Sequence, residues 1–393
     1  MNWLDVARLA AAFSIIGIHT TTDSQGKVFA AYEVSERIFP ALMRTVSELA
    51  STEFFILVSL FLLAFKLEKN SVSHSYIATM KLQARRLLVP FAFWTVFYAF
   101  FVLIKANAFG YMDEMLVQLT SLKTWVDFFL LGTSQYHMHF VPTIFLIFLF
   151  HPIFKLALNS PILGLLVIPF LMFNHTMSSW VYGHISDQNT LQYLARGIKV
   201  LSYLGYGFAA YSVLGLCQKK LNAEQSKRVF VFGLVAISLL FIIKLTHTAQ
   251  SIDVASYIPK IGMIYYAHVL LPICLLLVFF GSQYFHWPEN VSKWSKYTFG
   301  TYLIHPAVID IIDIFLKDNS LAPYQLVIFK YSATLSIVLL ISVGISKIPF
   351  LAWTIGLGPL PFIESKMKDS SKKEPAVELF ENKKSSIQTL TSN

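Results

Sequence analysis

The chain has 393 residues, of which 55% are apolar and only 13% are charged, whereas about a quarter of the residues in a typical soluble domain carry a charge. A soluble protein of this length could not keep so much apolar surface out of water, so we exclude that class and predict a polytopic membrane protein. The net charge of +9 then indicates basic cytosolic loops and a basic tail. Nucleic-acid binding is disfavoured, because no basic patch with interleaved aromatic residues occurs outside the tail.

Apolar runs divide the sequence into about ten predicted membrane spans. They cover approximately residues 4–22, 49–65, 87–104, 139–157, 161–174, 198–217, 229–245, 261–281, 298–316 and 327–346. Lys and Arg gather in the segments after the second, sixth and eighth spans, which the positive-inside rule assigns to the cytosol. With ten spans both termini are also cytosolic. We therefore expect an all-α helix bundle in the cytoplasmic (inner) membrane of the cell, surrounded by membrane lipids and without a nucleic-acid partner.

The first predicted span carries an ionisable pair. Arg8 and His19 lie eleven positions apart in a run that is apolar from Leu9 to Ile18. Eleven steps of a helix make three turns plus about 20°, so both side chains lie on one face, roughly 16 Å apart along the axis. Such a pair is costly in a membrane and usually faces a bundle interior or a watery cavity, which makes it a candidate functional site. In the simpler alternatives, His19 only bonds a neighbouring helix and Arg8 pairs with Asp5.

The second predicted span places an acidic group at the depth of His19. This span runs inward, so Glu53, near its start, lies close to the predicted outer surface. A carboxylate can orient an imidazole and raise its basicity, as in hydrolase triads, and we predict that Glu53 does so for His19. The alternative is a solvated carboxylate at the membrane surface.

A basic cluster stands immediately before the third span and contains Lys81, Arg85 and Arg86. Arginine guanidinium groups match phosphate oxygens in bidentate geometry, so the cluster predicts a clamp for a phosphorylated donor on the cytosolic side. The alternative is that these residues only anchor the topology, as cytosolic Lys and Arg do in any case.

The later spans contribute further histidines and aromatic residues. His137 and His139 lie at the predicted outer start of the fourth span, and His305 lies about seven residues in from the cytosolic end of the ninth. The outer segment 175–198 includes Trp180 and is suited to stacking against a sugar ring. The alternatives are a helix cap for the two neighbouring histidines and an interfacial aromatic belt for the segment. A metal site is disfavoured, because residues two apart diverge on a helix and no His-x-x-x-His motif occurs.

The end of the chain differs from the rest in composition. Beyond Glu364 the sequence turns to Lys, Ser and Glu, which predicts a disordered cytosolic tail. We therefore divide the chain into a membrane domain over residues 1–360 and a tail over 361–393. We find neither an internal repeat nor a soluble domain in the sequence.

Taken in order, these motifs resemble the integral-membrane acyltransferases of family three, which often O-acetylate surface polysaccharides. Arg8 and His19 match that family's Arg–ten residues–His signature. The other similar pieces are Glu53-Phe54-Phe55 with Ser59, the basic run Lys81, Arg85 and Arg86 followed by Pro90, His137-Met138-His139-Phe140 with Pro152, and Gly300-Thr301-Tyr302-Leu303-Ile304-His305-Pro306. The sequence departs from the family at Leu60, where a Gly is usual, and at His139, where a Trp is usual. The resemblance extends from residue 1 to about residue 360.

The resemblance implies an acyl-CoA-dependent O-acetyltransferase. Acetyl-CoA, the acyl donor, would bind from the cytosol, and the thioester would reach His19 through the bundle. His19 would then act either as general base on the acceptor hydroxyl or as a transient acyl carrier, with Arg8 lining the donor path. The candidate donor contacts are Lys81, Arg85, Arg86, Tyr302 and His305. The acceptor would be a hydroxyl of an extracytoplasmic glycan or a lipid-linked sugar, with His137, His139 and Trp180 as candidate contacts.

A polysaccharide exporter or flippase with the same membrane fold is the alternative function. Discontinuous helices near the midplane would favour it, and Pro169 in the fifth span and Pro272 in the eighth are weak indications of this kind. A membrane sensor or scaffold is a third possibility, although the tail carries no recognisable output domain.

Overall fold

The computed structural model describes residues 2–24, 26–50, 52–69, 75–318 and 320–360, so the predicted tail lies outside the described residues. Within the described part every regular element is a helix. The α-helices are α1 (Asn2–Thr20), α2 (Val34–Ser47), α3 (Thr52–Lys69), α4 (Tyr76–Phe109), α5 (Met112–Thr120), α6 (Leu122–Leu130), α7 (Phe140–Phe148), α8 (His151–Asn159), α9 (Val167–His184), α10 (Gln188–Gln218), α11 (Ala223–Asp253), α12 (Gly262–Gly281), α13 (Val291–Ser295), α14 (Thr298–Phe315) and α15 (Pro323–Ser346). Three short 3-10 helices are η1 (Glu48–Ala50), η2 (Pro161–Leu166) and η3 (Ala352–Ile355).

The helical membrane bundle predicted from composition is confirmed, with fewer clear spans than predicted. In the described residues, eight helical segments are long and apolar enough to cross a membrane. A ninth is added if α7 and α8, which meet at an angle of 64°, count as one broken span. The predicted span that is not among them is the first, residues 4–22, which is α1 and whose apolar run is interrupted by Asp5, Arg8 and His19. Helix α1 nevertheless packs inside the bundle, against α3, α12, α14 and α15.

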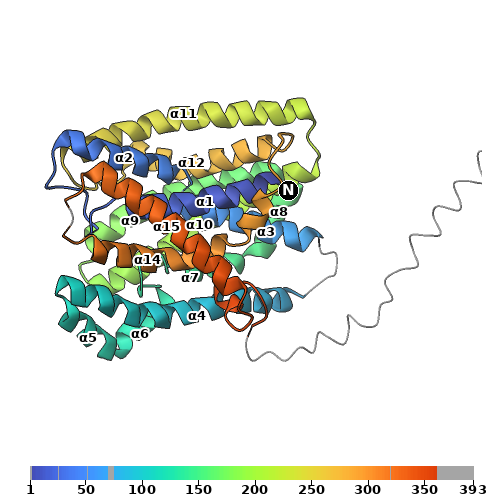
Figure 1. Cartoon of the computed structure of the whole chain (residues 1–393). Coiled ribbons are helices and arrows are strands. Elements are labelled where there is room, and N and C mark those ends of the chain that lie inside the picture. The colour runs from blue at the N-terminus through green and yellow to red at the C-terminus, as the bar shows by residue number, and fades with distance from the viewer. Residues whose placement is uncertain (1, 25, 51, 70–74, 319, 361–393) are drawn as a thin grey trace, which may run out of the picture.

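The bundle has a buried centre and a lipid-facing periphery. In their most apolar stretches, 83% of α10 and 78% of α14 are buried, against 11% of α11. In Figure 1, α11 accordingly runs along the upper edge of the molecule and α4 along the lower edge, with α1, α10 and α14 between them. Ionisable side chains on α1 and α14 therefore face protein rather than lipid, which is where a membrane protein can keep them.

Small residues let the helices around α10 approach closely. A Cβ atom added at Gly207 would lie 2.3 Å from Cζ of Phe154 on α8, and one added at Gly215 would lie 2.4 Å from the Leu158 carbonyl oxygen. Close backbone approach at small residues is a main source of attraction between helices in a membrane, where apolar burial gives little.

We expect Gly207→Ala to destabilise the folded protein by about 1–3 kcal/mol, because the new methyl group overlaps the Phe154 ring. Gly197→Ala, on the same helix, is the matched control, since a Cβ there meets nothing within 4 Å. Thermal unfolding of both variants in the same lipid would measure the difference. Equal melting temperatures would show that α8 and α10 do not pack as described.

Candidate active site

Three histidines from separate parts of the chain meet at the end of α1. The ring of His19 lies 5.5 Å from that of His305 on α14, measured between centroids, and His305 lies 5.2 Å from His137 in the loop before α7. The Tyr136 ring is 4.3 Å from His19. We call His19, His137 and His305 the histidine cluster. His137 and His305 are buried, whereas Tyr136 keeps 43% of its surface exposed, so the cluster lies just beneath the surface of the bundle.

The loop that carries His137 turns back on itself at a glycine. Gly132 has a φ of +70°, and a Cβ atom there would lie 2.5 Å from the backbone of His139. Only glycine tolerates both conditions. Gly132 therefore lets the beginning of this loop pack against the backbone of His139, at the start of α7. Tyr302 of α14 fixes the same loop from the other side, since its hydroxyl donates to the carbonyl oxygen of His137.

Two nitrogens of the histidine cluster are buried without a hydrogen-bond partner in the described part of the chain. Nδ1 of His305 lies 2.8 Å from the Tyr302 carbonyl oxygen, which requires that nitrogen to carry the proton and leaves Nε2 of a neutral ring as an acceptor. That Nε2 has no described partner, and the His137 ring contacts the backbone of Leu303 through one nitrogen, which leaves its other nitrogen without a described partner. Buried polar atoms are normally satisfied, so these two nitrogens call for an explanation such as a bound substrate.

His305 was predicted about seven residues in from the cytosolic end of α14, as a donor contact. Its position along the helix is as predicted, but its ring lies beside that of His19. The reason is that α1 and α14 run in the same direction: Arg8 contacts Thr298 at the start of α14, and His19 meets His305 two turns further on.

The prediction that Arg8 and His19 share one helix face is confirmed, because both side chains face the same neighbouring segment. Nη1 of Arg8 lies 3.4 Å from Oγ of Ser295, and Nη2 lies 3.3 Å from Oγ1 of Thr298. Arg8 also pairs with Asp5 at 3.4 Å, as the simpler alternative stated. These bonds fix the guanidinium near the N-terminal ends of α1 and α14.

Glu53 lies in a different set of contacts from the one predicted. Its Oε1 accepts a hydrogen bond of 2.5 Å from the hydroxyl of Tyr203 on α10. Among the described residues no hydrogen bond or ring contact joins Glu53 to His19, whose ring neighbours are Tyr136 and His305. Equal depth in the membrane, which the sequence predicts, does not ensure that two side chains face each other across the bundle.

A cavity of about 530 Å³ lies near the other end of the bundle, between α3, α4, the start of α14 and η3. Lys66 and Arg86 contribute its positive charges, whereas Arg85 and Lys81 are not among its lining residues. The lining positions on α4 are Gln83, Arg86 and Leu87, which share one face by their spacing of three and four residues, and Arg85 points away from that face. Lys66 was missed in the sequence because it resembles an ordinary flanking lysine.

Aromatic side chains separate this cavity from the histidine cluster. Phe299 lines the cavity, and Tyr302 and His305 follow it at intervals of three residues on the same face of α14. Phe55 of α3 stacks on Tyr302 with ring centroids 5.7 Å apart. Tyr302, predicted as a donor contact, therefore lies between the cavity and the histidines.

Of the remaining predicted site residues, His139 is half-buried beside the histidine cluster and Trp180 lies at the surface. Nδ1 of His139 is 2.7 Å from the Tyr136 carbonyl oxygen at the start of α7. Trp180 is 51% exposed on α9 and stacks on His184, which fits the interfacial alternative. In the part of the chain that the structure describes, no group of three His, Cys, Asp or Glu side chains is arranged to hold a metal ion.

Comparison with known families gives one result. The family model described as "Acyltransferase domain" matches residues 1–347, which include all three histidines of the cluster and both cationic residues of the cavity. Neither the curated proteins nor the solved structures yield a match.

Proposed function

The chain belongs to the acyltransferase 3 family of membrane O-acyltransferases, and on this premise we propose that it transfers an acetyl group from cytosolic acetyl-CoA to a hydroxyl of an extracytoplasmic glycan or lipid-linked sugar. The family gives the reaction class, an acyltransferase acting within a multi-pass membrane protein. The donor, the acceptor and the residues that act on them are the proposal.

The observation that carries the proposal is the set of unpartnered imidazole nitrogens beside His19. An acceptor hydroxyl that donates to one of them would satisfy a buried acceptor atom, which otherwise costs about 1–3 kcal/mol. With His19 as general base, the hydroxyl oxygen bonds to the thioester carbonyl carbon, the carbon–sulfur bond breaks, and the proton passes through His19 to the leaving thiolate. In the two-step route a His19 nitrogen bonds to the thioester carbonyl carbon while the carbon–sulfur bond breaks and the thiolate leaves. The hydroxyl oxygen then bonds to the same carbon, the carbon–nitrogen bond breaks, and the hydroxyl proton goes to the freed imidazole.

The cavity near α3 and α4 is suited to the donor. Lys66 and Arg86 offer charge-assisted hydrogen bonds to phosphate oxygens, and the cavity of about 530 Å³ has room for part of a nucleotide. From Phe299 to His305 the distance along α14 is roughly 9 Å at 1.5 Å per residue. The narrow acyl-bearing arm of acetyl-CoA would have to cover this distance past Phe55 and Tyr302, which must move aside.

We expect Lys66→Gln and Arg86→Gln each to weaken acetyl-CoA binding about tenfold, because each removes one charge-assisted hydrogen bond to phosphate. Arg85→Gln is the matched control and should change the dissociation constant less than twofold, since Arg85 does not line the cavity. Calorimetry on the full chain in lipid nanodiscs would measure all three. An equal loss of affinity in all three variants would show that Lys66 and Arg86 attract the donor only through general positive charge and do not contact its phosphates.

The exporter alternative has one structural observation in its favour. Helices α7 and α8 bend by 64° at their junction, as a broken helix of a transporter does. A deletion strain separates the two functions. The proposal predicts that surface glycan is still exported in normal amount and that mass spectrometry finds it without acetyl groups. Loss of the exported glycan itself would favour transport.

A further inference from the structure

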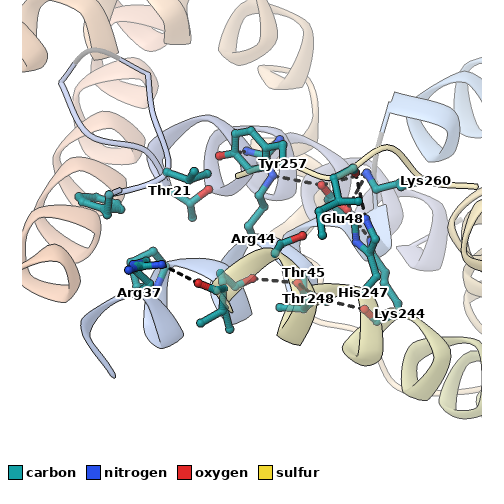
Figure 2. A pocket seen from close by; sticks show the side chains of 17 residues that line it. Thr21, Arg37, Arg44, Thr45, Glu48, Lys244, His247, Thr248, Tyr257 and Lys260 are labelled. Atoms are coloured by element: carbon teal, nitrogen blue, oxygen red, sulfur yellow. Dashed lines mark hydrogen bonds and ion pairs between the residues drawn. The ribbon is translucent and has the colours of Figure 1, made fainter. Parts of the chain in front are cut away.

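A second pocket opens beside the end of α1 that carries His19. It occupies about 130 Å³ between α2, the last turns of α11 and the segment before α12. Thr21, two residues beyond His19, lines it. Arg44 lines it too (Figure 2). Its Nη1 donates to the Ile18 carbonyl oxygen at 3.0 Å. The pocket and the histidine cluster are thus at the same end of the bundle, which is the end predicted to face outward.

Positive side chains outnumber negative ones in this pocket. Its lining includes Arg37, Arg44, Lys244 and Lys260, and Glu48 is the only acidic residue among the described lining residues. Three of the four cations share that one carboxylate, as Figure 2 shows, with N–O distances of 3.2 Å for Arg44, 2.7 Å for Lys244 and 3.2 Å for Lys260. Among the described lining side chains one negative charge therefore faces three positive charges, with a fourth nearby, and the Glu53 carboxylate acts on Lys244 from outside the pocket.

The fourth cation is bonded to backbone rather than to a carboxylate. Nε of Arg37 donates to the Tyr32 carbonyl oxygen at 2.9 Å, and Nη1 donates to that of Ile252 at 2.7 Å. Tyr257, which accepts a hydrogen bond from Arg44 at 3.1 Å, adds no negative charge because burial raises the pKa of its phenol. Lys244 is 1% exposed, so solvent does little to offset the excess charge.

A purely structural role does not account for this excess. Glu48 with one lysine would be enough to join η1 to α11. Arg44 and Lys260 keep 26% and 28% of their side chains exposed, so each is partly desolvated, and a partly desolvated cation costs free energy unless an anion compensates it. Guanidinium and ammonium groups are the usual protein donors to carboxylate and phosphate groups. A volume of about 130 Å³ compares with roughly 10–15 Å³ for a single water, so it admits one such group and part of a sugar ring.

We propose that this pocket binds an anionic group of the acceptor, a carboxylate or a phosphate carried by the sugar that is acetylated. The inference rests on the proposed function in one respect: it takes the acceptor to approach His19 from this end of the bundle. It implies that the enzyme selects acidic glycans or phosphate-linked sugars over neutral ones.

Binding of small probes to the full chain in phosphatidylcholine nanodiscs tests the proposal. The probes are glucuronic acid, glucose 1-phosphate and, as the neutral control, glucose. We expect at least one anionic probe to raise the melting temperature in a saturable way and glucose to have no effect. The stronger of the two anionic probes identifies the group as carboxylate or phosphate. Arg37→Gln and Lys260→Gln should each weaken that binding about tenfold. Lys227→Gln is the control and should leave the binding unchanged, because Lys227 is exposed and does not line the pocket.

Equal effects of glucose and both anionic probes would overturn the proposal, and so would unchanged binding in both charge variants. The His19→Ala variant keeps this test separate from the proposed function, because it should still bind the anionic probe while losing acetyl transfer. If that variant bound the probe and also retained transfer, the assignment of His19 would fail and the pocket would stand. If it lost transfer but the wild-type chain bound no anion, only the pocket assignment would fail.

Discussion

Replacing His19 with Ala should leave the protein in the membrane at wild-type level and lower its acetyl-transfer rate by roughly 10²–10⁴-fold, the range typical of a lost general base. The centroid of the His19 ring lies 5.5 Å from that of His305 and 4.3 Å from that of Tyr136, which is partly exposed. In the proposed mechanism, removing it takes away the group that accepts the hydroxyl proton. Acetate content of the surface glycan in a complemented deletion strain would measure the loss.

The control for this variant is His184→Ala. His184 lies on α9 with Nδ1 2.8 Å from the Trp180 carbonyl oxygen, in no described contact with the histidine cluster, so its loss should leave acetylation unchanged. Rapid quenching with radiolabelled acetyl-CoA adds a mechanistic readout. Label retained on the wild-type chain and absent from His19→Ala would select the two-step route. Full acetylation in His19→Ala would remove His19 from catalysis.

The residues of α1 show what the sequence predicts well. Helical periodicity alone places Arg8 and His19 on one face, and the contacts of Arg8 with Thr298 and of His19 with His305 confirm it. The prediction succeeds because positions within one helix are related by a fixed geometry. The same geometry explains why Arg86 lines the cavity of α3 and α4 and Arg85 does not.

Contacts between helices were predicted less well, because depth in the membrane does not specify rotation about a helix axis. Glu53 was placed at the depth of His19, yet its described partner is Tyr203 on α10. The contact between the His305 and His19 rings was not predicted, and the assignment of His305 to the donor stays a prediction. Both positions depend on how α3 and α14 are turned in the bundle, and packing against neighbouring helices sets this rotation.

The pocket near Arg44 had no signal in the sequence at all. Glu48 and Lys244 are 2.7 Å apart in space and almost two hundred residues apart in the chain. Each of them, taken alone, looks like a charge that ends a membrane span. Their meeting depends on α11, a 31-residue helix whose last turns extend beside α2.

Glu48→Gln is the substitution from which we expect the largest loss of stability. Lys244 is 1% exposed, and its described carboxylate partner is Glu48, which also contacts Arg44 and Lys260. A neutral amide at position 48 would leave the buried ammonium uncompensated, which typically costs about 3–5 kcal/mol. Glu224→Gln is the matched control: its ion pair with Arg228 is exposed on both sides, and such pairs contribute about 0–1 kcal/mol.

The double variant Glu48→Gln/Lys244→Met distinguishes two causes of the lost stability: the uncompensated charge of Lys244 and the loss of the other contacts of Glu48. If the cost arises from an unpaired buried charge, removing that charge should restore more than half of the stability, because an apolar side chain of similar length is tolerated where a lone ammonium is not. If instead Glu48 mainly holds η1 in place through its other contacts, the losses of unfolding free energy in the two single variants should add in the double variant. Reversible unfolding in mixed micelles, compared across the two single variants and the double variant, would measure the coupling free energy, and a value near zero would contradict the buried-charge argument.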